Sequence, residues 1–381
     1  MDLKLPEKFS EFNEARQNGF LKVKALKEEG KKVAGVFCTF TPLEILDAAG
    51  FVSVGLCGMS EETIEAAEVD LPKNLCPLIK SSYGFYVSDK CPYTYFSDLI
   101  VGETTCDGKK KMYELMGRGK KTYILHLPQG EADFAVDEWT KELRRFIEFI
   151  EKEYNVKITD EALRNAAKKR NEERTERALL MGVQKHVPPL AKGIDLYKTM
   201  DGVGFLFDED ERINKLKDLR LTIEKENNQE QNKNKKRILV TGCPIGGVLQ
   251  KTVGAIEENG GVVVCFENCA GLKACLKNVD IEKDDIVRAI AERYLSIGCA
   301  VMTPNNIRMN NLKELVKEYK IDGVVDIILH ACTTYEVETK IVSDLMKEIN
   351  MPFLSLQTDY TKGDEGQLLT RIQAFMEMIH T

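Results

Sequence analysis

Residues 101–116 read Val-Gly-Glu-Thr-Thr-Cys-Asp-Gly-Lys-Lys-Lys-Met-Tyr-Glu-Leu-Met, and in them the end of a strand meets the start of a helix. Residues 98–102 form an apolar run between turn formers, which indicates a buried strand. The apolar side chains of residues 109–116 recur at helical spacing. Cys106 therefore lies at a strand-to-helix turn, and Asp107 is the expected N-cap of the helix.

A cysteine at such a turn has an unusual electrostatic setting. Its sulfur faces unpaired backbone N–H groups and the positive end of the helix dipole, and the three lysines 109–111 follow closely. These features lower the pKa of a thiol and favour the thiolate, the form that binds metals or attacks electrophiles. For this stretch alone, a buried inert cysteine and a solvated lysine face are the alternatives.

The same alternation of strands and helices extends over most of the chain. Strands are expected at residues 32–38, 51–56, 98–101, 122–127, 237–241, 261–266, 323–329 and 352–356. Helices between successive strands imply parallel sheets, so we predict an α/β fold with two doubly wound, Rossmann-like domains. Open sheets of this kind bind ligands at the carboxyl ends of their strands.

The middle of the chain has a different character. Long charged helices are expected at residues 134–154 and 160–181, with Thr159 or Asp160 as the cap of the second. Residues 224–236 are polar and are typical of a solvated helix end and linker. The predicted segments are an N-terminal α/β domain, a helical region with its linker and a C-terminal α/β domain, at residues 1–133, 134–236 and 237–381.

The composition is that of a globular protein with reduced thiols. The chain has 381 residues, 43% hydrophobic and 30% charged, which predicts two or three domains. A net charge of −7 argues against a nucleic-acid binder, and no apolar run is long enough for a membrane span. Residues 1–8 lack the apolar core of a signal peptide, so we expect a cytoplasmic protein. The eleven cysteines then favour metal or redox chemistry over disulfides.

Six cysteines share one setting, a loop flanked by glycine, proline or polar residues, mostly just after a strand. They are Cys38, Cys76, Cys106, Cys243, Cys269 and Cys332. No C-x-x-C spacing occurs, which disfavours zinc ribbons, thioredoxin-like sites and ferredoxin-type runs. Ligands spread over the whole chain meet only in the assembled fold, so we predict one metal site in a cleft between the domains. Separate structural cysteines are the alternative.

The other five cysteines carry weaker expectations. Cys299 and Cys91 are reserve ligands, because both lie in turn-like settings. Cys57 and Cys265 lie in or beside apolar strands and are expected in the core. Cys275 is expected in a helix without a special role.

Two further residues are candidates for proton chemistry. His330, two residues before Cys332, could donate a hydrogen bond to sulfur or a proton to a substrate. Glu103 lies near Cys106 and could line a pocket. A satisfied strand-end histidine is the alternative for His330. No G-x-x-x-x-G-K-[ST] motif occurs, so this chain is not expected to bind ATP itself.

Longer stretches around these cysteines resemble the 2-hydroxyacyl-CoA dehydratase and benzoyl-CoA reductase family, most closely its double-cubane-cluster proteins. In the first half, the stretches that carry the resemblance are Phe-Cys-Thr-Phe-Thr-Pro-Leu-Glu-Ile at 37–45, Leu-Pro-Lys-Asn-Leu-Cys-Pro-Leu-Ile-Lys-Ser-Ser-Tyr-Gly at 71–84 and the stretch at 101–116 quoted above. In the second half they are Gly-Cys-Pro-Ile-Gly-Gly at 242–247, Phe-Glu-Asn-Cys at 266–269 and Ala-Cys at 331–332. Ordinary dehydratase subunits look similar at Cys76, Cys106 and Cys332, which hold one [4Fe-4S] cluster. The additional Cys38 and its two C-terminal counterparts, Cys243 and Cys269, fit a six-thiolate [8Fe-9S] site.

The resemblance implies a function. A separate ATP-hydrolysing iron–sulfur activator would pass low-potential electrons to this protein, which would reduce a small-molecule substrate at its double-cubane cluster. A [4Fe-4S] subunit of a 2-hydroxyacyl-CoA dehydratase or benzoyl-CoA-type reductase is the first alternative. A non-catalytic zinc or scaffold protein is the second. Because related proteins form dimers and the middle helices offer apolar stripes, a homodimer is expected.

Overall fold

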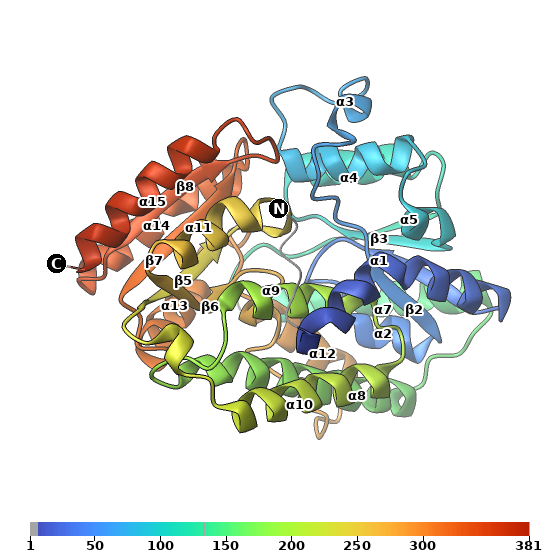
Figure 1. Cartoon of the computed structure of the whole chain (residues 1–381). Coiled ribbons are helices and arrows are strands. Elements are labelled where there is room, and N and C mark those ends of the chain that lie inside the picture. Colours follow the sequence, from blue (N-terminus) through green and yellow to red (C-terminus); the bar gives the residue numbers. More distant parts are fainter. Residues whose placement is uncertain (1–6, 133, 381) are drawn as a thin grey trace.

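The computed structural model describes residues 7–132 and 134–380 and contains two parallel four-stranded sheets (Figure 1). The first sheet has the order β2-β1-β3-β4, with β1 (Lys32–Val36), β2 (Phe51–Gly55), β3 (Leu99–Glu103) and β4 (Thr122–Leu125). The second has the order β6-β5-β7-β8, with β5 (Lys236–Gly242), β6 (Gly261–Glu267), β7 (Gly323–Leu329) and β8 (Phe353–Thr358). All strand pairs are parallel, so the predicted fold class is confirmed.

The strands form where β-branched and apolar residues run without interruption. β3, β6 and β7 are buried over their whole length, as is typical of parallel strands covered by helices on both faces. The helices of the N-terminal part are α1 (Glu7–Glu28), α2 (Leu43–Ala48), α3 (Ile64–Ala67), α4 (Pro77–Val87), α5 (Pro92–Phe96) and α6 (Asp107–Met116). Those of the C-terminal part are α11 (Ala255–Glu258), α12 (Ile286–Leu295), α13 (Asn306–Glu318), α14 (Thr333–Glu348) and α15 (Glu365–His380).

Four long helices occupy the middle of the chain: α7 (Ala135–Tyr154), α8 (Asp160–Gly182), α9 (Gly193–Gly202) and α10 (Glu209–Glu226). Figure 1 shows α8 and α10 side by side beneath the blue N-terminal and the orange C-terminal halves. α8 contacts α2 of the first half and α12 of the second, and α12 also contacts α7. The middle helices therefore join the two α/β halves.

The structure settles which residue caps α8 and corrects the interpretation of residues 224–236. Thr159 caps α8, because its Oγ1 accepts a hydrogen bond from the Ala162 N–H at 3.1 Å. The stretch 224–236 is not a solvated linker throughout. Asn232 within it is 1% exposed, and its side-chain amide donates hydrogen bonds to the backbone carbonyls of Pro189 and Ala191. These buried carbonyl groups thereby obtain a hydrogen-bond partner. The expected segment boundary at residue 133 lies outside the described residues, and the segment limits stay a prediction.

Each sheet has a topological switch point between its first and third strands. The connections after β1 and β3, and those after β5 and β7, run to opposite sides and leave a crevice at the carboxyl edge. In the described part of the chain, no helix has the combined length and apolar character of a membrane span.

Candidate functional site

Three of the predicted thiols occupy the same backbone position, the N-cap of a helix with ten or more residues. Cys76 precedes α4, Cys106 precedes α6 and Cys332 precedes α14. Asp107 is therefore the first residue of α6 and not its N-cap, and its carboxylate pairs with Lys110 at 2.7 Å. A sulfur at an N-cap faces the free N–H groups and positive dipole end of its helix, which favour a thiolate.

The positions of the thiols also repeat between the two sheets. Cys38 follows β1 as Cys243 follows β5, and Cys106 follows β3 as Cys332 follows β7. Cys269 follows β6, two residues after the strand ends. The two switch points thus each carry two cysteines, which lie just past strand ends.

All six predicted thiols and the reserve Cys299 line one cavity of about 480 Å³, which we call the thiol cavity. Its cysteines are Cys38, Cys76, Cys106, Cys243, Cys269, Cys299 and Cys332. The other reserve ligand, Cys91, lies elsewhere, at the N-cap of α5, where its Sγ accepts a hydrogen bond from the Thr94 N–H at 3.4 Å. All eleven cysteines are free thiols.

The donor set suits a group with several metal atoms. Within residues 7–132 and 134–380, no set of three or more His, Cys, Asp or Glu side chains is arranged to hold a metal ion. The seven sulfurs are instead distributed around a cavity wall. Soft thiolates spread in this way fit an iron–sulfur cluster, in which each of several irons takes its own thiolate.

The thiols of Cys76 and Cys243 each make a hydrogen bond to the sulfur of Cys332. Hydrogen bonds from the thiols of Cys243 and Cys76, together with the backbone N–H of Tyr335, lower the pKa of Cys332. The hydrogen bond to Cys332 and burial raise the pKa of Cys76, and burial with the same kind of hydrogen bond raises that of Cys243. Of the three sulfurs, Cys332 is therefore the one at which these contacts favour the thiolate.

Lys109 supplies a positive charge to the wall of the thiol cavity. Burial alone would lower the pKa of Lys109, but the neighbouring Tyr113 and the thiols of Cys38, Cys57 and Cys106 raise it. Its Nζ donates to the Phe37 carbonyl at 3.1 Å. Burial raises the pKa of Cys38, and the Lys109 charge opposes that rise. Lys109 is half-buried and lines the cavity, so it is not part of a solvated lysine face.

The backbone beside two of the thiols is specialised. Gly242, before Cys243, has φ +106°, and a Cβ there would lie 2.2 Å from the Ile327 carbonyl oxygen, so only glycine fits. Ala331, before Cys332, has φ +57°, a left-handed conformation that costs a residue with a side chain about 1–2 kcal/mol. Strain of this kind is held in place by the surrounding fold.

The two candidates for proton chemistry lie in different surroundings. His330 is exposed, its N–H donates to the Thr358 carbonyl at 2.8 Å, and its side chain does not line the thiol cavity. Glu103 is fully buried and accepts a hydrogen bond from the Thr41 hydroxyl. Burial raises the pKa of Glu103 to about 7, and among the described residues its Oε2 has no hydrogen-bond partner.

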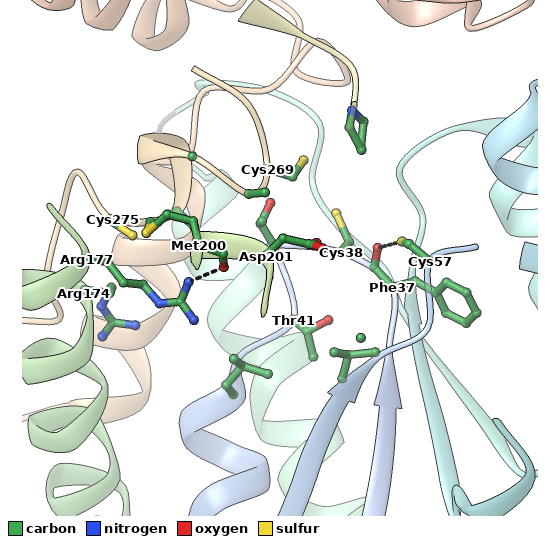
Figure 2. Close-up of a pocket in the computed structure, with 18 of the residues that line it drawn as sticks. Phe37, Cys38, Thr41, Cys57, Arg174, Arg177, Met200, Asp201, Cys269 and Cys275 are labelled. Atoms are coloured by element: carbon green, nitrogen blue, oxygen red, sulfur yellow. Dashed lines mark hydrogen bonds between the residues drawn. The ribbon is translucent and has the colours of Figure 1, made fainter. Parts of the chain in front are cut away.

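A second cavity of about 330 Å³ shares Cys38, Cys269 and Lys109 with the first, and we call it the arginine chamber. Its arginines are Arg170, Arg174, Arg177 and Arg293. Figure 2 shows Cys38 and Cys269 on one side and Cys275 beside Arg174 and Arg177 on the other. Cys57 and Cys275, expected in the core and in a helix, both line this chamber, whereas Cys265 is buried in β6 as expected.

The arginines of the chamber are mostly paired with buried carboxylates. Arg170 makes two hydrogen bonds to Asp47, at 2.6 and 2.8 Å, and Arg177 donates to Glu173 at 2.8 Å. Arg293 differs, because among the described residues it has no carboxylate partner and donates to the backbone carbonyls of Ala274 and Lys277. These buried networks hold the chamber walls rigidly.

The sequence-based prediction missed two residues at the thiol cavity. Tyr335 lines it and is 7% exposed, and Lys273 donates to the Tyr335 hydroxyl at 2.7 Å. Burial raises the pKa of Tyr335 well above its usual value, so the phenol stays protonated. The one available signal was position, since Tyr335 follows Cys332 by one helical turn.

Comparisons with known proteins give a family match over most of the chain. The family model described as 2-hydroxyglutaryl-CoA dehydratase, D-component, matches residues 38–379. The chain is 48% identical to the putative dehydratase subunit YjiM of Escherichia coli, with 98% of each chain covered. It is 23% identical to the (R)-phenyllactyl-CoA dehydratase beta subunit of Clostridium sporogenes and 22% identical to a benzoyl-CoA reductase subunit of Thauera aromatica, over 94% and 92% of each chain.

The family match spans nearly the whole chain and covers all of the cysteines that line the thiol cavity. The relatives named above also align with this chain over nearly their full length. The chain therefore belongs to the 2-hydroxyacyl-CoA dehydratase and benzoyl-CoA reductase family.

Proposed function

We propose that this protein is the reductase component of an ATP-driven iron–sulfur system and holds a double-cubane [8Fe-9S] cluster in its thiol cavity. The observation that carries the proposal is the convergence of six thiols, from both α/β halves, on one cavity of about 480 Å³. An ordinary [4Fe-4S] site takes three or four protein thiolates, so this cavity has more cysteines than such a cluster requires.

In this proposal Cys38, Cys76, Cys106, Cys243, Cys269 and Cys332 hold the cluster, with Cys299 in reserve. When bound, the cluster would supply low-potential electrons to a small molecule in the cavity. The chain contributes charge compensation through Lys109 and through the helix N-termini behind Cys76, Cys106 and Cys332. Both features stabilise negative charge on sulfur.

The chain also provides a proton near the site. We propose Glu103 as this donor, since its buried carboxyl has a pKa of about 7 and is protonated in part at neutral pH. Neither side chain lines the thiol cavity, but Glu103 is buried and lies near Cys38, whereas His330 is exposed and remains a second proposed donor with weaker support.

The arginine chamber is the proposed substrate chamber. Its volume of about 330 Å³ is at the lower end of the roughly 300–1,000 Å³ found for small-molecule pockets, and it adjoins the thiol cavity at Cys38 and Cys269. This size favours a small substrate over a complete coenzyme A thioester.

The electron source is proposed to be a separate ATP-hydrolysing iron–sulfur activator. The lack of a G-x-x-x-x-G-K-[ST] motif in this chain supports a division of labour, because ATP hydrolysis then belongs to another protein. We also propose a homodimer in the cytoplasm, where the eleven thiols stay reduced. Gel filtration at the mass of one 43.1 kDa chain would contradict the dimer.

The test is the iron content of anaerobically purified protein and of two matched variants. We expect about eight iron atoms per chain in the wild type. Cys106→Ser replaces a soft thiolate by a harder oxygen donor and should remove about half or more of the iron, with little loss of folding. Cys91→Ser is the control, because Cys91 is also an N-cap cysteine but lies away from the thiol cavity. Full iron in Cys106→Ser would contradict the ligand assignment.

The names of the relatives favour one second candidate, a [4Fe-4S] subunit of a 2-hydroxyacyl-CoA dehydratase that pairs with a different chain. Several similar proteins are named as dehydratase or reductase subunits. This candidate predicts about four irons per chain, tight binding of an acyl-CoA and dehydration in the presence of an activator. Bound zinc without visible absorption would exclude both candidates and favour a scaffold.

A further inference from the structure

Tyr335 lies in the first turn of α14 and contributes its hydroxyl to the wall of the thiol cavity. Lys273 approaches that hydroxyl from a short turn after β6 and donates to it at 2.7 Å. Both side chains are buried, with 7% of Tyr335 and 3% of Lys273 exposed.

The chemistry of the two groups fixes the direction of the hydrogen bond. Lys273 forms an ion pair with Glu267 at 3.5 Å, which keeps its amino group charged. An ammonium group has three donors and no acceptor, so the Tyr335 oxygen must accept from Lys273. The phenol proton is thereby directed to another acceptor. The Cys299 sulfur, on the same cavity wall, lies 3.8 Å from the Tyr335 oxygen.

A second cation lies near the phenol ring. The Arg308 guanidinium lies 5.1 Å from the centre of the Tyr335 ring. Arg308 is itself fixed, because it pairs with Glu267 at 3.2 Å and with Glu338. A hydroxyl that accepts a bond from a cation is also a stronger donor through its own proton.

We propose that Tyr335 donates a hydrogen bond to the Cys299 sulfur at the wall of the thiol cavity, with Lys273 as its positioning residue, and so raises the reduction potential of the group bound there. The inference rests on the proposed function, because it requires a redox group in the cavity that the reserve ligand Cys299 contacts or ligates. Hydrogen bonds directed at sulfur beside an iron–sulfur cluster stabilise its reduced, more negative state. Tyr335 thus takes the part that the sequence-based prediction gave to His330.

The test is a reductive titration of the iron-loaded protein, followed by electron paramagnetic resonance. Tyr335→Phe removes the donor and leaves the ring, so we expect unchanged iron content and a more negative potential. One hydrogen bond accounts for up to about a tenfold change in the reduction equilibrium, or about 59 mV for one electron. Tyr319→Phe is the control, since Tyr319 is a buried tyrosine of the same half that does not line the thiol cavity.

A second variant keeps the test decisive if Tyr335→Phe folds poorly. Replacement of Tyr335 by 3-fluorotyrosine keeps the shape and gives a more acidic phenol, which is a stronger donor, so the potential should become less negative. A purely structural tyrosine would leave the potential unchanged in both variants, and that result would overturn the inference alone. A wild-type protein that holds no iron would instead overturn the proposed function.

Discussion

Single positions in the backbone decide where the sulfur atoms of this protein lie. Cys76, Cys106 and Cys332 each occupy a helix N-cap, a position that usually holds serine, threonine, aspartate or asparagine. A thiol is a weak cap for backbone N–H groups, and the cluster proposed above would give the sulfurs at these three N-caps a further partner.

The strain at Ala331 gives a prediction at this scale. Ala331→Gly relieves a left-handed backbone at φ +57° and should raise the free energy of unfolding by about 0.5–1 kcal/mol, after the larger chain entropy of glycine is counted. Chemical denaturation of the iron-free protein measures the change. The same substitution at Ala289, inside α12 and 2% exposed, should destabilise by about 1 kcal/mol. Equal signs at the two sites would show that Ala331 is not strained.

The sequence predicted which cysteines lie together better than it predicted which other side chains surround them. The cysteines were found because strand ends are readable from apolar runs and the carboxyl edge of a parallel sheet gathers them. His330 was a candidate because it is close to Cys332 in sequence, with a satisfied strand-end histidine as the alternative, and its side chain is exposed to solvent. Lys273 and Tyr335 were missed because they are 62 residues apart and meet only through tertiary packing.

At the scale of elements, the protein is one unit used twice. Both sheets have the strand order second, first, third, fourth, and in each the first and third strands lead to cavity cysteines. The sequence predicted every strand of both sheets, since each is a short apolar run after a helix. It did not predict how the polar stretch 224–236 packs, because the burial of Asn232 depends on carbonyls some 40 residues earlier.

The contact between α9 and β6 depends on one buried carboxyl, Glu257. Its Oε1 accepts from the N–H groups of Gly193 at 2.7 Å and Val263 at 3.2 Å. Burial raises the pKa of Glu257 to about 7, above the value of about 4.3 for an unfolded chain. The folded protein therefore keeps this proton up to a higher pH than the unfolded chain. Its stabilising effect is complete below about pH 4.3 and is lost as the pH rises to about 7.

Glu257→Gln should remove this part of the pH dependence. Between about pH 4.3 and 7, the decrease in the free energy of unfolding should be smaller in the variant than in the wild type, by on the order of 3 kcal/mol. Urea denaturation at several pH values measures it, with the exposed Glu282→Gln as control. Part of the slope should remain, because burial also raises the pKa of Glu103 to about 7 and of Asp326 to about 6. An unaltered slope would contradict the assignment.

At the scale of the whole molecule, buried charges fix the two halves to the middle helices. Glu44 of α2 is fully buried and accepts hydrogen bonds from Arg174 of α8 and from the Tyr294 hydroxyl of α12, both at 2.8 Å. Three parts of the chain thus meet at one carboxylate. Removal of one partner of such a buried pair usually costs several kcal/mol, so the relative placement of the halves is strongly specified.

This placement makes the thiol cavity a property of the whole chain, since Cys76 comes from the first half and Cys332 from the second. A group that binds the native cavity and not the unfolded chain must stabilise the assembled protein. We expect iron-loaded protein to unfold roughly 5 °C or more above iron-free protein in anaerobic calorimetry.

The difference in unfolding temperature between loaded and iron-free protein should need thiols from both halves. Cys76→Ser and Cys332→Ser should each remove most of it, because each takes one sulfur from the shared wall, whereas Cys91→Ser should retain it. If either cavity variant kept the full difference, the bound group would belong to one half alone. The convergence of the two sheets on one cavity would then be a feature of packing and not of cofactor binding.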